Sequence, residues 1–388
     1  DEKRVKALGF LNNKGTDNFS ARIITVNGKI TAAQQKCVAE AAELFGNGII
    51  TFTTRLSMEV QGIPYDKIEE FIAYIGKVGL ETGGTGKKIR PIVSCKGTTC
   101  QYGLQDTFAL SEEIHNRFYK GYRNVTLPHK FKIAVGGCPN NCVKPNLNDV
   151  GIIGQCIPNF HKEICKGCKK CIISKNCPMN ACEVVDKKLK IDEDKCIHCG
   201  RCDKKCPFES IKESKHGFKI YIGGTWGKRV SHGVALSKIF TDKEEALNVI
   251  EKAILLYKEQ GISGERFATT INRIGFEKVE KQLLDNDLLE RKEEIINSIQ
   301  KILVVYTIQV DLFDTLMNLK GCGYLERAAI ENTEDYIIEY HRTGKELLEE
   351  FDSYCMIISQ YCREHQEWIR VSSIEYKKLI SRRVGRKK

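Results

Sequence analysis

The chain has 388 residues, 41% of them hydrophobic and 29% charged, which is enough for two or three globular domains with proper cores. Its formal net charge of +11 suits anionic substrates or an acidic electron carrier, but no zinc-finger, RNP or helix-turn-helix signature accompanies it, so we expect no nucleic acid partner. No apolar run of about 18 residues occurs, and the start at Asp1 lacks a signal-peptide pattern and an initiator Met, so we expect a trimmed, cytoplasmic protein without a membrane span.

The first part of the chain alternates between strand and helix patterns. The predicted elements are strands at residues 19–26 and 49–60 and helices at residues 31–45 and 65–78. Thr31 and Gln34 have the spacing of a capping box, which fixes the start of the first of these helices. This order indicates an α/β or α+β lobe.

Two close cysteine pairs follow, Cys95 with Cys100 and Cys138 with Cys142. An iron–sulfur cluster takes four thiolates, and a pair on each of two loops can close round one cube if the fold brings the loops together. The chain holds 18 cysteines, mostly in CxxC and CxxxC runs without an export signal, which favours metal over disulfides. Oxygen-labile clusters indicate a reducing, anaerobic setting.

Residues 127–135, between the two pairs, alternate between polar and apolar side chains as a strand does. Lys130 and Lys132 would then leave the same face of that strand, beside the cluster. This is the layout of an anion site next to an electron source.

Residues 155–215 form an insertion that holds 10 of the 18 cysteines. Cys196, Cys199, Cys202 and Cys206 have the spacing of the bacterial ferredoxin run, whose fourth cysteine ligates the other cluster. The partner run is Cys165, Cys168, Cys171 and Cys177. We therefore predict two [4Fe–4S] clusters with crossed ligation, one on Cys165, Cys168, Cys171 and Cys206 and the other on Cys196, Cys199, Cys202 and Cys177.

Two alternatives stay open for the insertion. Five residues separate Cys171 from Cys177, where three are usual before the last cysteine of the run, so Cys182 is a rival ligand. Pro178 after Cys177 nevertheless matches the motif. Zinc is the competing metal, which the two CxxCxxC runs with trailing Cys-Pro disfavour. Cys156 and Cys182 are interpreted as structural thiols.

The α/β pattern returns after the insertion. The predicted elements are a strand at 218–222, a helix from a Thr241 cap to Glu259 and one further helix at 266–284. From residue 288 to 388 charged residues interleave with Ile and Leu at helical spacing, which predicts a helical extension.

The cysteine pairs, the Leu-Pro-x-Lys-Phe-Lys stretch ending at Lys132 and the Gly-Gly-Cys-Pro-Asn-Asn-Cys stretch ending at Cys142 closely resemble the sirohaem-containing sulfite and nitrite reductases. Among these the chain is most similar to anaerobic and dissimilatory sulfite reductase subunits that carry a ferredoxin insert. The resemblance spans about residues 22–275. One departure is that four residues separate Cys95 from Cys100, where the family usually has five.

The resemblance implies an α+β fold with a ferredoxin-like lobe at residues 1–86. A sirohaem and [4Fe–4S] lobe follows in two parts, at 87–154 and 216–287, interrupted by the 2[4Fe–4S] ferredoxin insert at 155–215. The helical extension at 288–388 lies outside the recognised core.

The resemblance also implies roles for individual residues. Sirohaem would be joined to the cube on Cys95, Cys100, Cys138 and Cys142, with Cys142 bridging to the haem iron. The anion would be held by Arg22, Arg90, Lys130 and Lys132. Contacts to the cofactor would come from Arg55, Gly224 and Lys228.

The expected activity is the six-electron reduction of sulfite to sulfide, which needs a cofactor because no side chain can supply it. No GxGxxG fingerprint for NAD or FAD opens a helix, so electrons would pass through the insert from a small carrier or a reductase subunit. Nitrite reduction and a non-catalytic iron–sulfur electron-transfer subunit are the alternatives. Long relatives contain two facing halves and this chain one, so we expect a homo-oligomer or a paired subunit.

Overall fold

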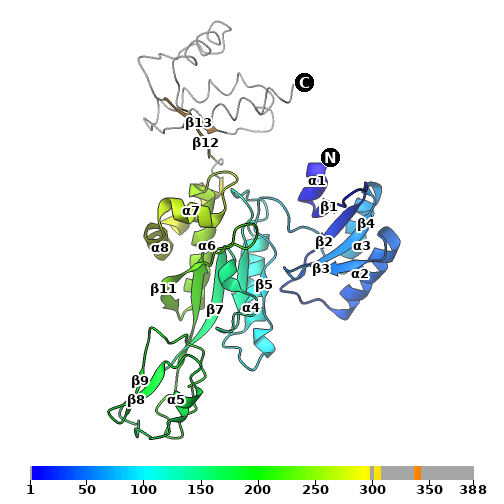
Figure 1. Ribbon diagram of the computed structural model, residues 1–388. Coiled ribbons are helices and arrows are strands. Elements are labelled where there is room, and N and C mark those ends of the chain that lie inside the picture. The colour runs from blue at the N-terminus through cyan, green and yellow to red at the C-terminus, as the bar shows by residue number, and fades with distance from the viewer. Residues whose placement is uncertain (1, 298–300, 307–335, 342–388) are drawn as a thin grey trace. The chain divides into compact units, whose positions relative to one another are not determined.

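A computed structural model describes residues 2–297, 301–306 and 336–341. By their contacts the residues fall into two units, Asp1–Gly261 with Glu265–Lys292 and Ile262–Gly264 with Glu293–Lys388. The first unit contains every predicted site residue (Figure 1). Within the described part, no helix combines the length and apolar character that a bilayer crossing requires.

The first lobe is an antiparallel sheet in the order β1-β2-β4-β3, with helices beside it (Figure 1). Its elements are α1 Glu2–Ala7, β1 Phe10–Asn12, β2 Phe19–Ile23, α2 Ala32–Phe45, β3 Ile50–Phe52, β4 Met58–Ile63, the 3₁₀ turn Tyr65–Lys67 and α3 Ile68–Gly76. The capping box is confirmed, since the Gln34 N–H donates to Thr31 Oγ1 (3.1 Å) and the Thr31 N–H to Gln34 Oε1 (2.9 Å). Buried apolar residues such as Val38 and Phe71 fill the space between sheet and helices.

The single strand expected at residues 49–60 is wrong, because these residues form the β3–β4 hairpin. Thr53 and Ser57 close the turn, with their hydroxyl oxygens 2.6 Å apart and the Thr53 N–H donating to Ser57 O (2.8 Å). Leu56 adopts a left-handed φ of 61° there. The alternation of side chains runs through both strands, so periodicity alone does not reveal the turn.

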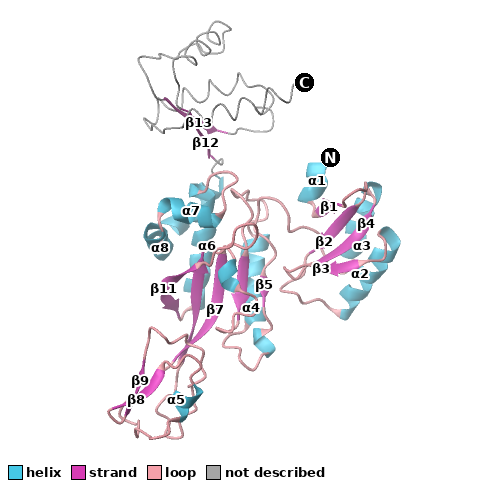
Figure 2. Cartoon of the chain, in the orientation of Figure 1, coloured by secondary structure: helices cyan, strands magenta, loops and turns pink. Residues whose placement is uncertain are grey.

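The second lobe is a mixed sheet in the order β11-β10-β7-β6-β5 (Figure 2). Its strands are β5 Val93–Ser94, β6 Ile133–Gly136, β7 Val150–Ile157, β10 Lys215–Ile222 and β11 Val234–Phe240. β5, β6 and β7 run parallel, whereas β10 and β11 are antiparallel to their neighbours. Helix α4 Thr107–Ile114 contacts β5 and β6, and α6 Lys243–Gln260 contacts β10 and β11. The 3₁₀ turns Gly97–Thr99 and Pro145–Leu147 and the π-helix His115–Lys120 complete this lobe.

Two expectations for its helices need correction. The N-cap of α6 is Asp242, which accepts from the Glu245 N–H (2.7 Å), and not the expected Thr241. The helix expected at 266–284 is two helices, α7 Phe267–Ile274 and α8 Phe276–Leu284. They divide at Gly275, whose φ of +98° does not fit a helix and favours glycine.

The insertion leaves the sheet at the end of β7 and returns at the start of β10 (Figure 1). It contains α5 Ile172–Asn176 and a hairpin of β8 Cys182–Val185 and β9 Lys188–Ile191. It has a small core of its own, formed by Ile173, Leu189 and Ile211 together with several cysteines.

The last part of the chain differs from the expected helical extension where it is described. α9 Asp287–Glu290 and α10 Lys292–Asn297 are helices, but β12 Lys301–Tyr306 pairs antiparallel with β13 Tyr336–His341. The helical expectation is therefore wrong for those two segments, whose sequences are rich in β-branched and aromatic residues. The remainder of the predicted extension lies outside the described residues.

Arg55, at the tip of the β3–β4 hairpin, joins the two lobes. Its Nη2 donates to the carbonyl oxygens of Pro91 (2.6 Å) and Ile133 (3.1 Å), and its Nη1 to Asn148 Oδ1 (2.9 Å). Burial, with smaller contributions from Arg90, Arg22 and Arg266 against that of Asp149, lowers the pKa of Arg55 to about 10. The guanidinium remains charged at neutral pH and fixes the first sheet against the second.

We expect Arg55→Met to destabilise the protein, because two main-chain carbonyls would lose their donors. The free energy of unfolding should fall by about 2 to 4 kcal/mol in a chemical denaturation titration. Arg4→Met is the matched control, since Arg4 is exposed and its partner Glu69 is exposed too, and it should change nothing measurable. Equal stability of the two variants would contradict the proposed role of Arg55.

Candidate active site

The first cysteine pair is held by a close approach of two loops. Cys95 follows β5, and its Sγ accepts from the Gly137 N–H at the end of β6 (3.1 Å). A Cβ on Gly137 would lie 2.9 Å from Gly97 Cα, so glycine is needed where the loops meet. An N–H donor aimed at sulfur suits a cluster ligand at Cys95.

The structure brings the second pair to the same place. Burial raises the pKa of the Cys138 thiol, and the charges of Cys142, Cys95 and Cys100 raise it further, so the four thiols share one neighbourhood. Cys142 is exposed and the other three are half-buried. The exposed thiol is the one expected to bridge to the haem iron.

Arg22 and Arg90 meet at one carbonyl. Nη1 of each donates to Gly84 O, at 3.4 Å from Arg22, and Arg22 also pairs with Glu59 (2.6 Å). Burial, then Arg22 and Arg266, lower the pKa of Arg90 to about 10, with Tyr119 opposing. Arg90 Nε is buried and has no partner within the described residues, so it is a donor available to an anion.

Lys130 and Lys132 flank a buried aromatic residue. Phe131 is fully buried, with its ring centroid 5.6 Å from that of Tyr257 and 5.3 Å from that of Phe267. The lysines are half-buried, as alternation about Phe131 requires. The expected strand at 127–135 is nevertheless too long, because β6 begins only at Ile133.

Asp149 and Arg266 belong to this site, although the sequence interpretation missed both. Asp149 is fully buried and accepts from Arg266 Nη2 at both carboxylate oxygens (2.9 Å each) and from the Lys132 N–H at Oδ2 (2.9 Å). Burial raises the pKa of Asp149 while Arg266 opposes the rise. The available signal for Asp149 was a charged residue just before β7, a strand buried along all but its last residue. Arg266 has no such signal in the sequence.

The positively charged side chains of the site lie close enough together to affect one another's pKa values. Burial, followed by Arg55 and Arg266, lowers the pKa of Lys132 to about 8, and burial, Arg266 and Arg90 lower the pKa of Lys130. Neither ammonium group has a hydrogen-bond partner among the residues that the structure describes. Such a surplus of positive charge, with the unpartnered Nε of Arg90 and Arg266, fits a polycarboxylate cofactor and a small anion.

The glycine-rich stretch after β10 packs on the second cysteine loop. A Cβ on Gly224 would lie 2.4 Å from Asn146 O, so glycine is needed for this contact between main chains. His232 Nδ1 lies 3.0 Å from Asn146 Nδ2, so the stretch after Gly224 contacts the same residue a second time. Lys228 is exposed in the loop beyond Gly224, and the structure does not bring it to the cations described above.

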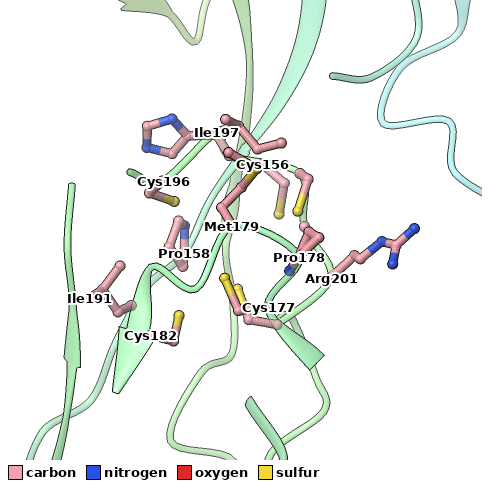
Figure 3. A pocket seen from close by; sticks show the side chains of 14 residues that line it. Cys156, Pro158, Cys177, Pro178, Met179, Cys182, Ile191, Cys196, Ile197 and Arg201 are labelled. Atoms are coloured by element: carbon pink, nitrogen blue, oxygen red, sulfur yellow. The ribbon is translucent and has the colours of Figure 1, made fainter. Parts of the chain in front are cut away.

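One predicted ligand set of the insertion lines a single cavity (Figure 3). Cys177, Cys196, Cys199 and Cys202 surround it, and burial raises the pKa of Cys202 to about 12. Cys156 and Cys182 line the same cavity, so the choice between Cys177 and Cys182 stays open.

Cys165, Cys171 and Cys206 of the other set lie at the small core of the insertion, which Cys177 and Cys202 of the first set also contact. Leu189 N–H donates to Cys165 Sγ (3.5 Å) and the Ser210 hydroxyl to Cys206 Sγ (3.1 Å). Burial would raise the pKa of Cys206, but Ser210 and nearby N–H groups lower it. Among the described residues no three His, Cys, Asp or Glu side chains converge closely enough for a single metal ion.

The description "Nitrite and sulphite reductase 4Fe-4S domain" belongs to a family model that matches residues 85–293, more than half of the chain. This chain belongs to the nitrite and sulphite reductase family. The ferredoxin-like half domain of the same enzymes matches residues 12–78, which confirms the expected ferredoxin-like lobe within an α+β fold.

Proteins similar to this chain include sulfite reductases. The coenzyme F420-dependent sulfite reductase of Methanocaldococcus jannaschii is 32% identical over 246 residues, 63% of this chain but 38% of the relative. An uncharacterised protein of that organism is 32% identical over 69% of this chain and 91% of its own length. The crystal structure of dissimilatory sulfite reductase I shares the fold, with a TM-score of 0.56 at 21% identity and 69% coverage of each chain.

We expect Asp149→Asn to destabilise the protein strongly, because Arg266 would keep a largely buried charge without its counter-charge. The free energy of unfolding should fall by about 3 to 5 kcal/mol. Asp186→Asn is the control, since this carboxylate is 89% exposed in its pair with Lys190, and should leave the unfolding curve unchanged. Unfolding midpoints that coincide for both variants would exclude the structural role given to Asp149.

Proposed function

We propose that the chain reduces sulfite to sulfide by six electrons at a sirohaem coupled to a [4Fe–4S] cluster on Cys95, Cys100, Cys138 and Cys142. The observation that carries this proposal is a group of closely spaced cations. Arg90, Lys130, Lys132 and Arg266 belong to the lobe that holds these cysteines, and Arg22 meets them from β2 of the first lobe. When bound, the coupled cofactors supply the electrons and the iron to which the anion binds.

The residues of the chain bind the anion and supply protons. Arg22 and Arg90 meet at Gly84 O, and each guanidinium stays charged and can hold oxyanion oxygens. Lys130 and Lys132 carry protons that leave with the sulfite oxygens as water. Their lowered pKa values make these protons easier to give up than those of exposed lysines.

The three residues proposed to contact the cofactor differ in the groups that they can offer it. Arg55 has one N–H left, on Nη1, after its bonds to Pro91, Ile133 and Asn148, so only that donor is available to a sirohaem carboxylate. Gly224 and Lys228 would approach the cofactor from the loop after β10.

Electrons would arrive through two [4Fe–4S] clusters in the insertion, from a small carrier or reductase subunit. A further copy or a paired subunit would complete the site, because the chain holds one of the two halves that face each other in long relatives. Nitrite is the alternative substrate, since both anions would meet the same cations. Specific activities on the two anions with reduced methyl viologen would distinguish them.

We expect Lys132→Ala to lower dye-linked sulfite turnover by about 2 to 4 kcal/mol of transition-state stabilisation while the sirohaem absorbance remains. Lys36→Ala is the control, because Lys36 is 78% exposed on α2. Loss of the pigment in Lys132→Ala would show that Lys132 holds the cofactor instead. Unchanged turnover would exclude it from the chemistry.

The pH profile provides a separate test. Because Lys132 loses its proton as the pH rises through about 8, turnover should fall above that pH. Lys132→Arg keeps the charge, so the falling limb should move to higher pH. A limb that stays in place in Lys132→Arg would assign it to another group.

A further inference from the structure

The two ligand sets of the insertion differ in their connection to the sirohaem lobe. Cys199 forms a β-bridge with Cys156 at the end of β7, and Gly200 packs so closely that an added Cβ would lie 3.1 Å from Leu104 Cδ2. Leu104 N–H donates to Gly137 O (2.9 Å), and the Gly137 N–H donates to Cys95 Sγ (3.1 Å). The set with Cys199 is therefore the inner one, joined to Cys95 by packed and hydrogen-bonded groups.

The set with Cys165 is the outer one. Its contacts are with the β8–β9 hairpin, where Leu189 N–H donates to Cys165 Sγ and Lys188 Nζ donates to Cys165 O (2.7 Å). Gly167 packs on the turn of that hairpin, since an added Cβ would lie 2.0 Å from Lys187 O. Figure 1 shows this hairpin in the lower part of the insertion, with β7 entering from above. Electrons bound for Cys95 would thus be accepted first at the outer set.

The chain around the outer ligand set is basic, and no acidic side chain within that stretch of sequence balances its charge. Residues 165–176 contain four lysines and no acidic residue, and all four lysines are exposed. None of them forms an ion pair with a described residue. By contrast, Lys190, Lys195 and Lys212 elsewhere in the insertion pair with carboxylates. Ile172, 44% exposed, lies among the four lysines in sequence and adds an apolar contact.

We propose that Lys166, Lys169, Lys170, Ile172 and Lys175, termed the lysine face, dock an acidic protein carrier of the ferredoxin class. The inference rests on the proposed function and names its electron donor. In the step, the reduced carrier loses one electron and the cluster on Cys165, Cys168, Cys171 and Cys206 gains it, with no bond made or broken.

The charge pattern favours this partner over a neutral one. Unpaired cations around an apolar centre attract an acidic surface and orient it, which raises the association rate more than the final affinity. Such attraction is screened over about 10 Å at 0.1 M salt, so binding should weaken steeply as salt is added.

The decisive experiment measures binding without turnover. Isothermal titration calorimetry of the holoprotein with a purified, oxidised acidic ferredoxin gives a dissociation constant at low and at high salt. Lys169→Glu with Lys170→Glu should raise that constant by about tenfold or more at low salt. The control is Lys278→Glu with Lys281→Glu, the same charge change at two exposed lysines of α8, and should leave it within about twofold.

Turnover separates docking from chemistry. The double glutamate variant should raise KM for reduced ferredoxin and leave the methyl viologen rate unchanged, because the small dye needs no docking surface. Lys169→Gln with Lys170→Gln should give a smaller effect in the same direction. Equal weakening of binding in the α8 control, or an unchanged dissociation constant in the Lys169 and Lys170 glutamate variant, would overturn the proposal that the lysine face docks ferredoxin. A wild-type protein that binds ferredoxin through these lysines but reduces no sulfite would refute the proposed function alone.

Discussion

The buried carboxylate of Asp149 is the constraint on which the site depends. It is fully buried and binds Arg266 and the Lys132 main chain, while Arg55 and the side chains of Lys130 and Lys132 lie close enough to interact with its charge. Without that charge the cations would repel one another in a partly desolvated space. With it, they remain close enough to lower one another's pKa values, and under the proposed function they would present a positive field to the anion.

A second charged residue, Arg55, links the two lobes. Arg55 reaches from the β3–β4 hairpin to the carbonyl oxygens of Pro91, just before β5, and Ile133, the first residue of β6. The two strands that lead to the cysteine loops are therefore fixed at their starts by a residue of the other lobe. Gly137 and Gly97 then let the cysteine loops approach each other. The inner thiols of the insertion join this arrangement through Cys156 and Leu104, which makes the insertion an extension of the cluster lobe rather than an independent module.

Much of this was predictable because it is local. The capping box at Thr31 and the alternation of burial about Phe131 each depend on a few consecutive residues, and the structure bears both out. Arg266 and Asp149 lie 117 positions apart in the chain, so no local pattern could pair them. The turn at Thr53–Ser57 and the break at Gly275 were not predicted because strand or helical periodicity continues across them. The strands at 301–306 and 336–341 were not predicted because their spacing of apolar residues fits a helix as well as a strand.

The central claim is that this cation group faces a sirohaem joined to an iron–sulfur cube. The most direct measurement is an anaerobic absorption and EPR spectrum with an iron count, on protein expressed in a host that makes sirohaem. The account predicts sirohaem bands and about twelve iron atoms in three clusters, besides the haem iron. A colourless sirohaem region with about eight iron atoms would contradict it and leave an iron–sulfur electron carrier.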